Sequence, residues 1–337
     1  MSISLDEHLT RGSMTKEVQD QLIGARNLFF GFLKGIDSQF NIKLPDYVYH
    51  YTSVENFYSM VESDTIRMFT ISNFEDRLER KLPLDIENQV KAHITNNDTF
   101  EKHDFAGMLN TALSDDHVFI QSNTPTSQNS YLWENYGNKG QGICLRISTA
   151  KYIAFLEETI DDFDLLPDYF KCCFVSYDNA WLNQFLEMLL PVVKAVDSKL
   201  NNAALLIWFF FLEYWKNFTK LPEPYEKEKE FRFVVSDNYS LFLFLCSQLA
   251  KWGLFSAEDS TAISDAFLTE YTDRKNKLRQ ALGYTQTKQS SFVTIPFSRV
   301  VDSVLIGPNS KITKTEISKG TNYKVKKSQV ERILGRL

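Results

Sequence analysis

Strand-forming segments occur in separate groups along this chain, with helix-forming segments between and around them. Regular alternation of strand and helix would predict a parallel sheet, whereas grouped strands are typical of an α+β fold. Runs rich in Val, Ile, Tyr and Phe predict strands over 44–52, 65–71, 117–122, 142–147, 171–178, 228–236 and 301–309. Helical spacing of apolar residues, with Ser53 as an N-cap for the second segment, predicts helices over 15–35, 53–64, 84–114, 179–220 and 240–283.

We expect one α+β domain over residues 44–310, because these strands and helices follow one another without a linker. A helical segment at 1–43 would precede it, and a basic segment at 311–337 would follow it. Two helical blocks, 179–220 and 240–283, are expected as insertions on one side of the sheet. The 43% hydrophobic content is enough to fill a core of this size.

The charge and hydropathy of the chain restrict its partners. A net charge of −6 argues against general attraction to nucleic acid, although a local basic groove stays open. We interpret the basic tail as a solvated strand and helix. The most apolar stretch, 202–215, is too short for a membrane span and contains Glu213. The first residues lack an apolar signal core, so we expect a cytoplasmic protein with no membrane partner.

The cysteines indicate no metal site and no disulfide framework, because none of their spacings is that of a zinc site and adjacent cysteines pair poorly. We expect buried thiols in a reducing compartment at Cys144, Cys172, Cys173 and Cys246.

His50, Tyr51 and Thr52 end the first predicted strand. An imidazole can donate one hydrogen bond and accept another, so His50 suits a sugar hydroxyl, and Thr52 adds a second polar group. The alternative is a core histidine followed by the start of a helix cap.

Trp133 and Tyr136 precede three closely spaced glycines, Gly137, Gly140 and Gly142. The aromatic rings could stack on a planar ligand ring, and the glycines could let the backbone approach a ligand. The alternative is core packing ahead of a tight turn.

The segment "EKEFR" holds Glu228, Glu230 and Arg232 two residues apart. On a strand these side chains would project from one face, while Phe231 and Phe233 point into a core. Two carboxylates beside an arginine can provide an oriented, ionised acid. The alternative is a charge ladder on an edge strand.

Residues 50–67, "HYTSVENFYSMVESDTIR", resemble a segment of the poly-ADP-ribosyl transferases. That segment has a His-x-Ser/Thr start, then Asn-Phe, an aliphatic pair and a turn before Leu/Ile-Arg. The matching residues are His50, Thr52, Asn56, Phe57, Met60, Val61, Ile66 and Arg67. Tyr51 and Asp64 stand where that segment has glycines.

Residues 47–310 resemble the bacterial domain-of-unknown-function family 2971. The resemblance lies in a Tyr-His-Tyr-Thr start, a Trp-x-x-Tyr-Gly segment, a Glu-x-Glu-aromatic-Arg segment and the late strand "SVLIGPNSK". A Phe-Asn-Asp-Pro-Phe-Glu-like stretch is represented by Phe74, Asp76 and Glu79, with Glu75 and Arg77 at the usual Asn and Pro positions.

Together the resemblances imply an ADP-ribosyltransferase-like fold, which is a split antiparallel sheet with helical insertions. They also imply that the protein binds NAD as its substrate and needs no metal. They imply that His50 orients the ribose, that the Tyr51 backbone holds the nicotinamide amide, and that Thr52 and Arg67 belong to the same site. Trp133 or Tyr136 would form a wall beside the nicotinamide ring. Glu230 would be the catalytic carboxylate, with Glu228 activating an acceptor.

The function implied is NAD cleavage with transfer of ADP-ribose to a macromolecular acceptor, in a bacterial toxin or phage-defence effector. A regulatory or antitoxin partner is a further expectation. Two alternatives stay open: a binding module for nucleotides or nucleic-acid ends without turnover, and a metal-independent nuclease or RNA-phosphate-processing enzyme.

Overall fold

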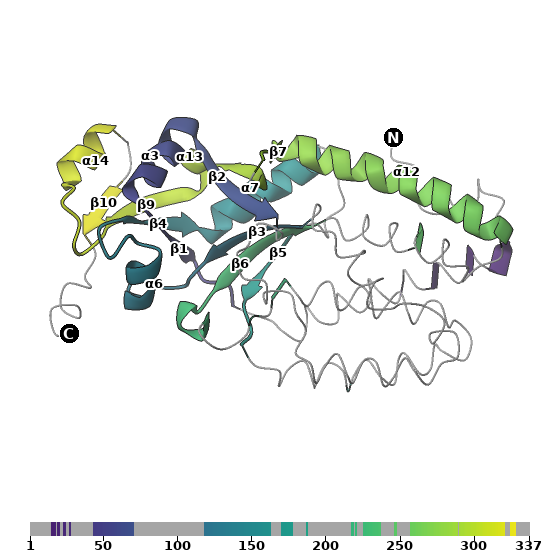
Figure 1. The fold of residues 1–337 in the computed structure, drawn as a ribbon, viewed down its shortest axis with the longest axis horizontal. Coiled ribbons are helices and arrows are strands. Elements are labelled where there is room, and N and C mark those ends of the chain that lie inside the picture. Colours follow the sequence, from purple (N-terminus) through teal and green to yellow (C-terminus); the bar gives the residue numbers. More distant parts are fainter. Residues whose placement is uncertain are drawn as a thin grey trace.

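The computed structural model (Figure 1) describes a body of strands and helices in several ranges of the chain. These are 43–70, 118–162, 170–177, 225–236, 257–288, 290–320 and 324–327, with isolated residues at 15–17, 19–20, 23–24, 27, 187, 217–218, 220 and 246–247. The expected helix 84–114, most of the segments 1–43 and 179–220, and Phe74, Asp76 and Glu79 lie outside the described residues.

One sheet has four strands in the order β1-β4-β9-β10. It consists of β1 (Tyr47–Thr52), β4 (Ile143–Ser148), β9 (Val301–Ile306) and β10 (Lys324–Lys327). Neighbours are antiparallel except for β9 and β10, which are parallel. The basic tail therefore contributes a strand to this sheet.

The second sheet has six strands in the order β5-β6-β3-β2-β8-β7. It consists of β2 (Thr65–Thr70), β3 (Val118–Asn123), β5 (Phe170–Phe174), β6 (Phe231–Ser236), β7 (Thr285–Gln286) and β8 (Ser291–Pro296). All its pairings are antiparallel. The chain thus has an α+β fold with antiparallel sheets, as the grouped strands predicted.

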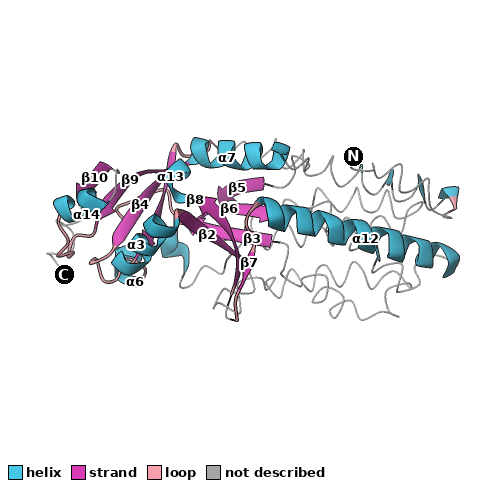
Figure 2. Cartoon of the chain, turned by 90° about the horizontal axis from the view of Figure 1, so that it is seen from above, coloured by secondary structure: helices cyan, strands magenta, loops and turns pink. Residues whose placement is uncertain are grey.

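Shorter helices lie beside the two sheets, and one long helix extends away from them. The short ones are α3 (Val54–Ser63), α6 (Ser130–Asn135), α7 (Thr149–Asp162), α13 (Phe297–Val300) and α14 (Lys314–Gly320). Helix α12 (Ala257–Ala281) extends away from the end of the molecule that holds α3, α6 and α14, as Figures 1 and 2 agree.

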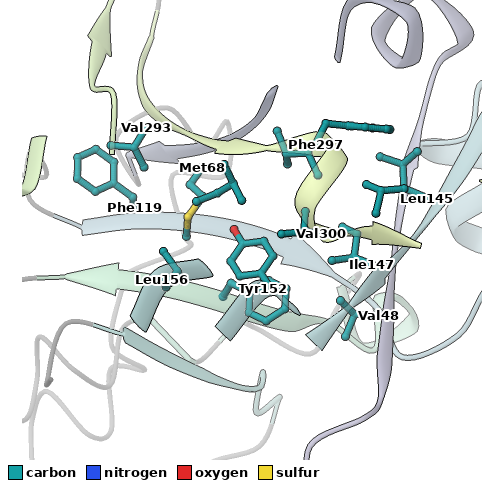
Figure 3. Close-up of a cluster of buried hydrophobic side chains, with 14 of the residues drawn as sticks. Val48, Met68, Phe119, Leu145, Ile147, Tyr152, Leu156, Val293, Phe297 and Val300 are labelled. Carbon is teal, nitrogen blue, oxygen red and sulfur yellow. The ribbon is translucent and has the colours of Figure 1, made fainter. Parts of the chain in front are cut away.

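The main core lies between the residues of the two sheets, around α7. Figure 3 shows Tyr152 of α7 with Val48 and Ile147 on one side and Met68 and Phe119 on the other. These side chains are fully buried. Tyr152 also stacks on Phe233, with ring centroids 3.9 Å apart and planes 9° apart.

Several elements escaped the sequence analysis. Strands β7 and β8 and helices α6, α7 and α13 were not predicted. The polar sequence of α6, SYLWEN, gives little helical periodicity, and its cap comes from the side chain of Asn129, which accepts from the Leu132 amide. The other described strands and α3 are confirmed, and Ser53 caps α3 as expected.

The prediction that 228–236 is one strand is wrong in its first residues. Glu228 ends a short 3-10 helix, η3 (Glu226–Glu228), and Lys229 has left-handed backbone angles. Strand β6 begins only at Phe231. It lies between β5 and β3, so the alternative of an edge-strand charge ladder is wrong as well.

Candidate active site

A pocket of about 770 Å³ lies where β1 separates from β3. Backbone bonds between Tyr49 and Thr124, of 2.8 and 3.0 Å, join the two sheets at a single isolated bridge. Beyond the bridge, most residues that line the pocket carry hydroxyl or amide groups. They come from β1, α3, β2, β3 and the end of α6. The lining residues are His50, Tyr51, Thr52, Ser53, Glu55, Asn56, Ser59, Met60, Ser63, Thr65, Ile66, Arg67, Phe69, Ile120, Gln121, Ser122, Asn135, Tyr136 and Asn138.

His50 is held in one orientation at the pocket wall. Its Nδ1 lies 3.1 Å from the carbonyl oxygen of Ser122, so Nδ1 carries a proton and donates it. Burial lowers the pKa of His50, which favours the neutral imidazole. In that tautomer Nε2 is an acceptor, which suits a ligand hydroxyl. Thr52, on the same face of β1, is 5% exposed and also lines the pocket.

The backbone of Tyr51 points toward the pocket side of β1. In an antiparallel strand the N–H and C=O of successive residues face opposite edges, so residues two apart share an edge. Tyr49 bonds to Thr124 on the edge away from β4, so Tyr51 presents its amide and carbonyl on that same edge. Among the described residues no strand pairs with Tyr51 there. An edge of this kind can bind a planar amide through one donor and one acceptor.

The side chain of Tyr51 has a structural role. Its hydroxyl donates to the Thr126 carbonyl at 3.1 Å and accepts from the Asn129 amide at 3.3 Å. Its ring meets Trp133 edge-on, with centroids 4.8 Å apart. This packing fixes β1 against α6.

Trp133 does not lie in the pocket wall, contrary to the expectation that it could flank a ligand ring. It is fully buried, and its indole N–H donates to the Ser127 carbonyl at 3.2 Å. Tyr136, three residues on, does line the pocket and is 50% exposed. Core packing therefore describes Trp133, and only Tyr136 can contact a ligand.

Arg67 also lines the pocket, from the exposed side of β2. Its guanidinium lies 4.5 Å from the centre of the Phe292 ring. This contact orients the cation, and no carboxylate of the described residues is paired with it. Arg67 is thus placed to contact an anionic or hydroxyl-bearing ligand.

Glu230 forms a two-point ion pair with Arg232. Arg232 Nε lies 2.6 Å from Oε1, and its Nη2 lies 3.1 Å from Oε2. Both side chains are almost fully buried, and Arg232 Nη1 also donates to the Asn217 carbonyl at 2.9 Å. A pair of this geometry fixes the plane of the carboxylate.

Glu228 lies in the same cluster although it is not on the strand. Lys220 Nζ lies 2.9 Å from Glu228 Oε2 and 3.5 Å from Glu230 Oε2, and so bridges the two carboxylates. The Tyr136 hydroxyl donates to Glu228 Oε1 at 2.7 Å. The prediction that Glu228, Glu230 and Arg232 share one strand face is wrong, but the fold brings them together through the turn at Lys229.

Burial shapes the ionisation of this cluster. It raises the pKa of Glu230, while Lys220 and a hydrogen bond from the Ser122 side chain oppose that rise. Burial lowers the pKa of Arg232 to about 9, so the guanidinium is charged at neutral pH. Burial alone would lower the pKa of Lys220, but Glu230 and Glu228 raise it above its usual value. The two carboxyl groups thus lie beside the two cations.

Ser122 joins the two halves of the site. Its carbonyl accepts from His50, and its side chain lowers the pKa of Glu230. Ser122 also lines the pocket. His50 and Glu230 are thus separated by one residue of β3. Neither Glu228 nor Glu230 lines the pocket itself; Ser122 and Tyr136 stand in between.

Sequence reasoning missed Ser122 and Lys220. Ser122 lies in a strand predicted for its apolar residues, and only the register, with Ser122 opposite Arg232, brings it to Glu230. Lys220 precedes the charged segment by eight residues in a stretch with no motif. Nothing in the sequence alone ties either residue to the site.

Comparison with protein-family models, with characterised proteins and with solved structures found no match for this chain. The resemblances noted from the motifs stay predictions that rest on those residues. Within the described ranges, no group of His, Cys, Asp and Glu residues could hold a metal ion, and no helix is long and apolar enough to cross a membrane.

Proposed function

We propose that this protein cleaves NAD in the pocket beside His50 and transfers ADP-ribose to a macromolecular acceptor. The motif resemblance and the separation of two antiparallel sheets around the pocket support an ADP-ribosyltransferase-like fold. The bond between the anomeric carbon and the nicotinamide nitrogen breaks, and its electron pair neutralises the pyridinium. An acceptor oxygen or nitrogen then bonds to that carbon and gives up its proton.

The observation that carries the proposal is the link through Ser122. His50, which the resemblance assigns to the ribose, donates to the Ser122 carbonyl, and the Ser122 side chain lowers the pKa of Glu230, which the resemblance assigns to charge stabilisation. A sugar bound to His50 would lie within reach of the carboxylate cluster. Positive charge that develops on the ribose is stabilised by a preorganised carboxylate in a site that excludes water.

The pocket supplies the remaining contacts that NAD needs. The free edge of Tyr51 can hold the nicotinamide amide, in line with the role implied by the resemblance. His50 Nε2 can accept from a ribose hydroxyl, and Tyr136 can lie along the nicotinamide ring. Arg67 can contact the diphosphate or the second ribose. The acceptor and a toxin or phage-defence role rest on the resemblance alone.

The test of the proposed function is nicotinamide release from NAD by the purified chain and by His50→Ala. We expect turnover by the wild type and a loss of about 100-fold in the variant, because the ribose loses its orienting group. Tyr58→Ala is the matched control, since Tyr58 is exposed on α3 and is not in the pocket lining. Equal turnover by His50→Ala and the wild type would refute the proposed site.

A nucleotide-binding module without turnover is the second candidate. It is favoured by one observation: both oxygens of Glu228 and of Glu230 already have donors, and neither side chain reaches the pocket lining. Calorimetric binding of NAD that is lost in His50→Ala, with no nicotinamide released by the wild type, would support this candidate instead.

A further inference from the structure

The two glutamates differ in how firmly they are held. Glu230 uses both oxygens in the ion pair with Arg232, which has no exposed surface. If Glu230 turned toward a ligand, it would break both of its hydrogen bonds to a fully buried guanidinium. Loss of one partner of a buried pair is strongly unfavourable. Glu230 is therefore expected to stay paired with Arg232 when a ligand binds.

Glu228 is held more loosely on its pocket side. Lys220 binds Oε2, and Tyr136 is the donor that the described residues provide for Oε1. The Tyr136 ring is half-exposed and borders the pocket. If the ring turns outward, Oε1 loses one hydrogen bond, and a ligand hydroxyl or a developing positive charge can replace it.

The turn that carries Glu228 is tied to the helix that carries Tyr136. The Asn129 side chain, at the N-terminus of α6, donates to the Lys227 carbonyl at 2.7 Å. Tyr136 is the C-cap of the same helix, and its amide donates to the Leu132 carbonyl. The backbones on either side of the Tyr136–Glu228 bond are thus fixed, and only the Tyr136 side chain needs to move.

We infer that Glu228, rather than Glu230, is the carboxylate that contacts the ligand, and that the Tyr136 side chain covers it until a ligand displaces the phenol. This inference rests on the proposed function for its chemistry: Glu228 would stabilise the positive charge on the ribose as the bond to nicotinamide breaks. Lys220, which bridges Glu228 and Glu230, would be a positioning residue that holds Glu228 in place.

The first test needs no turnover. The folded protein is treated with a water-soluble carbodiimide and glycinamide, and amide formation at each glutamate is followed by mass spectrometry. Tyr136→Ala should increase labelling of Glu228 several-fold and leave Glu230 unlabelled. Glu226, exposed in the same turn, is the internal standard and should react equally in both proteins. Unchanged labelling of Glu228, or labelling of Glu230 first, would overturn the inference.

The second test measures nicotinamide release by Glu228→Gln, with Glu226→Gln as the matched control. We expect kcat to fall about 100-fold in Glu228→Gln, as for removal of a preorganised charge. The melting temperature should fall less than in Glu230→Gln, because Lys220 keeps Glu230 as a partner. Turnover in Glu228→Gln equal to that of the control would contradict the inference while the proposed function stands. A wild type without turnover would refute the proposed function, and the labelling result would still decide whether Tyr136 covers Glu228.

Discussion

At the scale of single residues, the buried pair of Glu230 and Arg232 anchors the site. Arg232 is fully buried and contacts both Glu230 oxygens. Glu230→Gln would remove the carboxylate that binds this guanidinium at two points. We expect the free energy of unfolding to fall by about 3–5 kcal/mol, the usual cost of removing one partner of a buried pair.

Urea denaturation measures this change. Glu226→Gln, an exposed substitution in the adjoining turn, should stay within about 0.5 kcal/mol of the wild type. A stability of Glu230→Gln equal to that control would mean that the ion pair does not anchor the site.

His50 gives a second prediction at this scale, on pH. Its pKa is lowered from 6.5 by burial, so between that value and the folded-state pKa the unfolded chain binds more protons. Stability should therefore decrease as the pH falls below about 6.5. His50→Gln should show a shallower decrease when urea denaturation is compared at about pH 7.5 and about pH 5. Parallel curves for the two proteins would argue against a buried, neutral His50.

At the scale of elements, the junction of β1, β4 and the end of α6 determines the shape of the pocket. Gly142 lies where these elements meet. A side chain there would overlap the Thr52 carbonyl oxygen and lie 2.8 Å from the Gly137 carbonyl oxygen. Because both obstacles are backbone atoms, β1 would have to move. Gly142→Ala should cost about 1–3 kcal/mol of stability, as overpacking does, and weaken NAD binding, measured by calorimetry. An unchanged melting temperature would show that the junction can relax.

The elements themselves were largely predictable, whereas their arrangement was not. Alternating and apolar runs indicated the strands β1 to β6 and β9, because side-chain periodicity is a local property. The register that sets Ser122 opposite Arg232, and the turn at Lys229 that removes Glu228 from the strand, depend on contacts between distant segments. The sequence therefore pointed to His50, Tyr136, Glu228 and Glu230 but not to Lys220 or Ser122, which connect them.

At the scale of the whole molecule, two antiparallel sheets separate beyond a single bridge and leave a polar pocket between them. One sheet supplies His50 and the free edge of Tyr51. The other supplies Ser122 and the ion pair at the start of β6. The pocket and the adjoining cluster of Glu228, Glu230, Lys220 and Arg232 thus require both sheets. A substitution that weakens the bridge at Thr124 should therefore lower both the ligand affinity and the free energy of unfolding.

The most direct measurement is the fate of NAD labelled separately in its nicotinamide and adenine parts, incubated with the purified chain in the presence of cell lysate. We predict that nicotinamide is released in the same molar amount as adenine label becomes bound to macromolecules, and that both fall together in His50→Ala. Release without bound label would indicate a hydrolase and contradict the transferase assignment. NAD that stays intact would contradict the proposed chemistry, and RNA cleavage in the same lysate without NAD would point to the nuclease alternative.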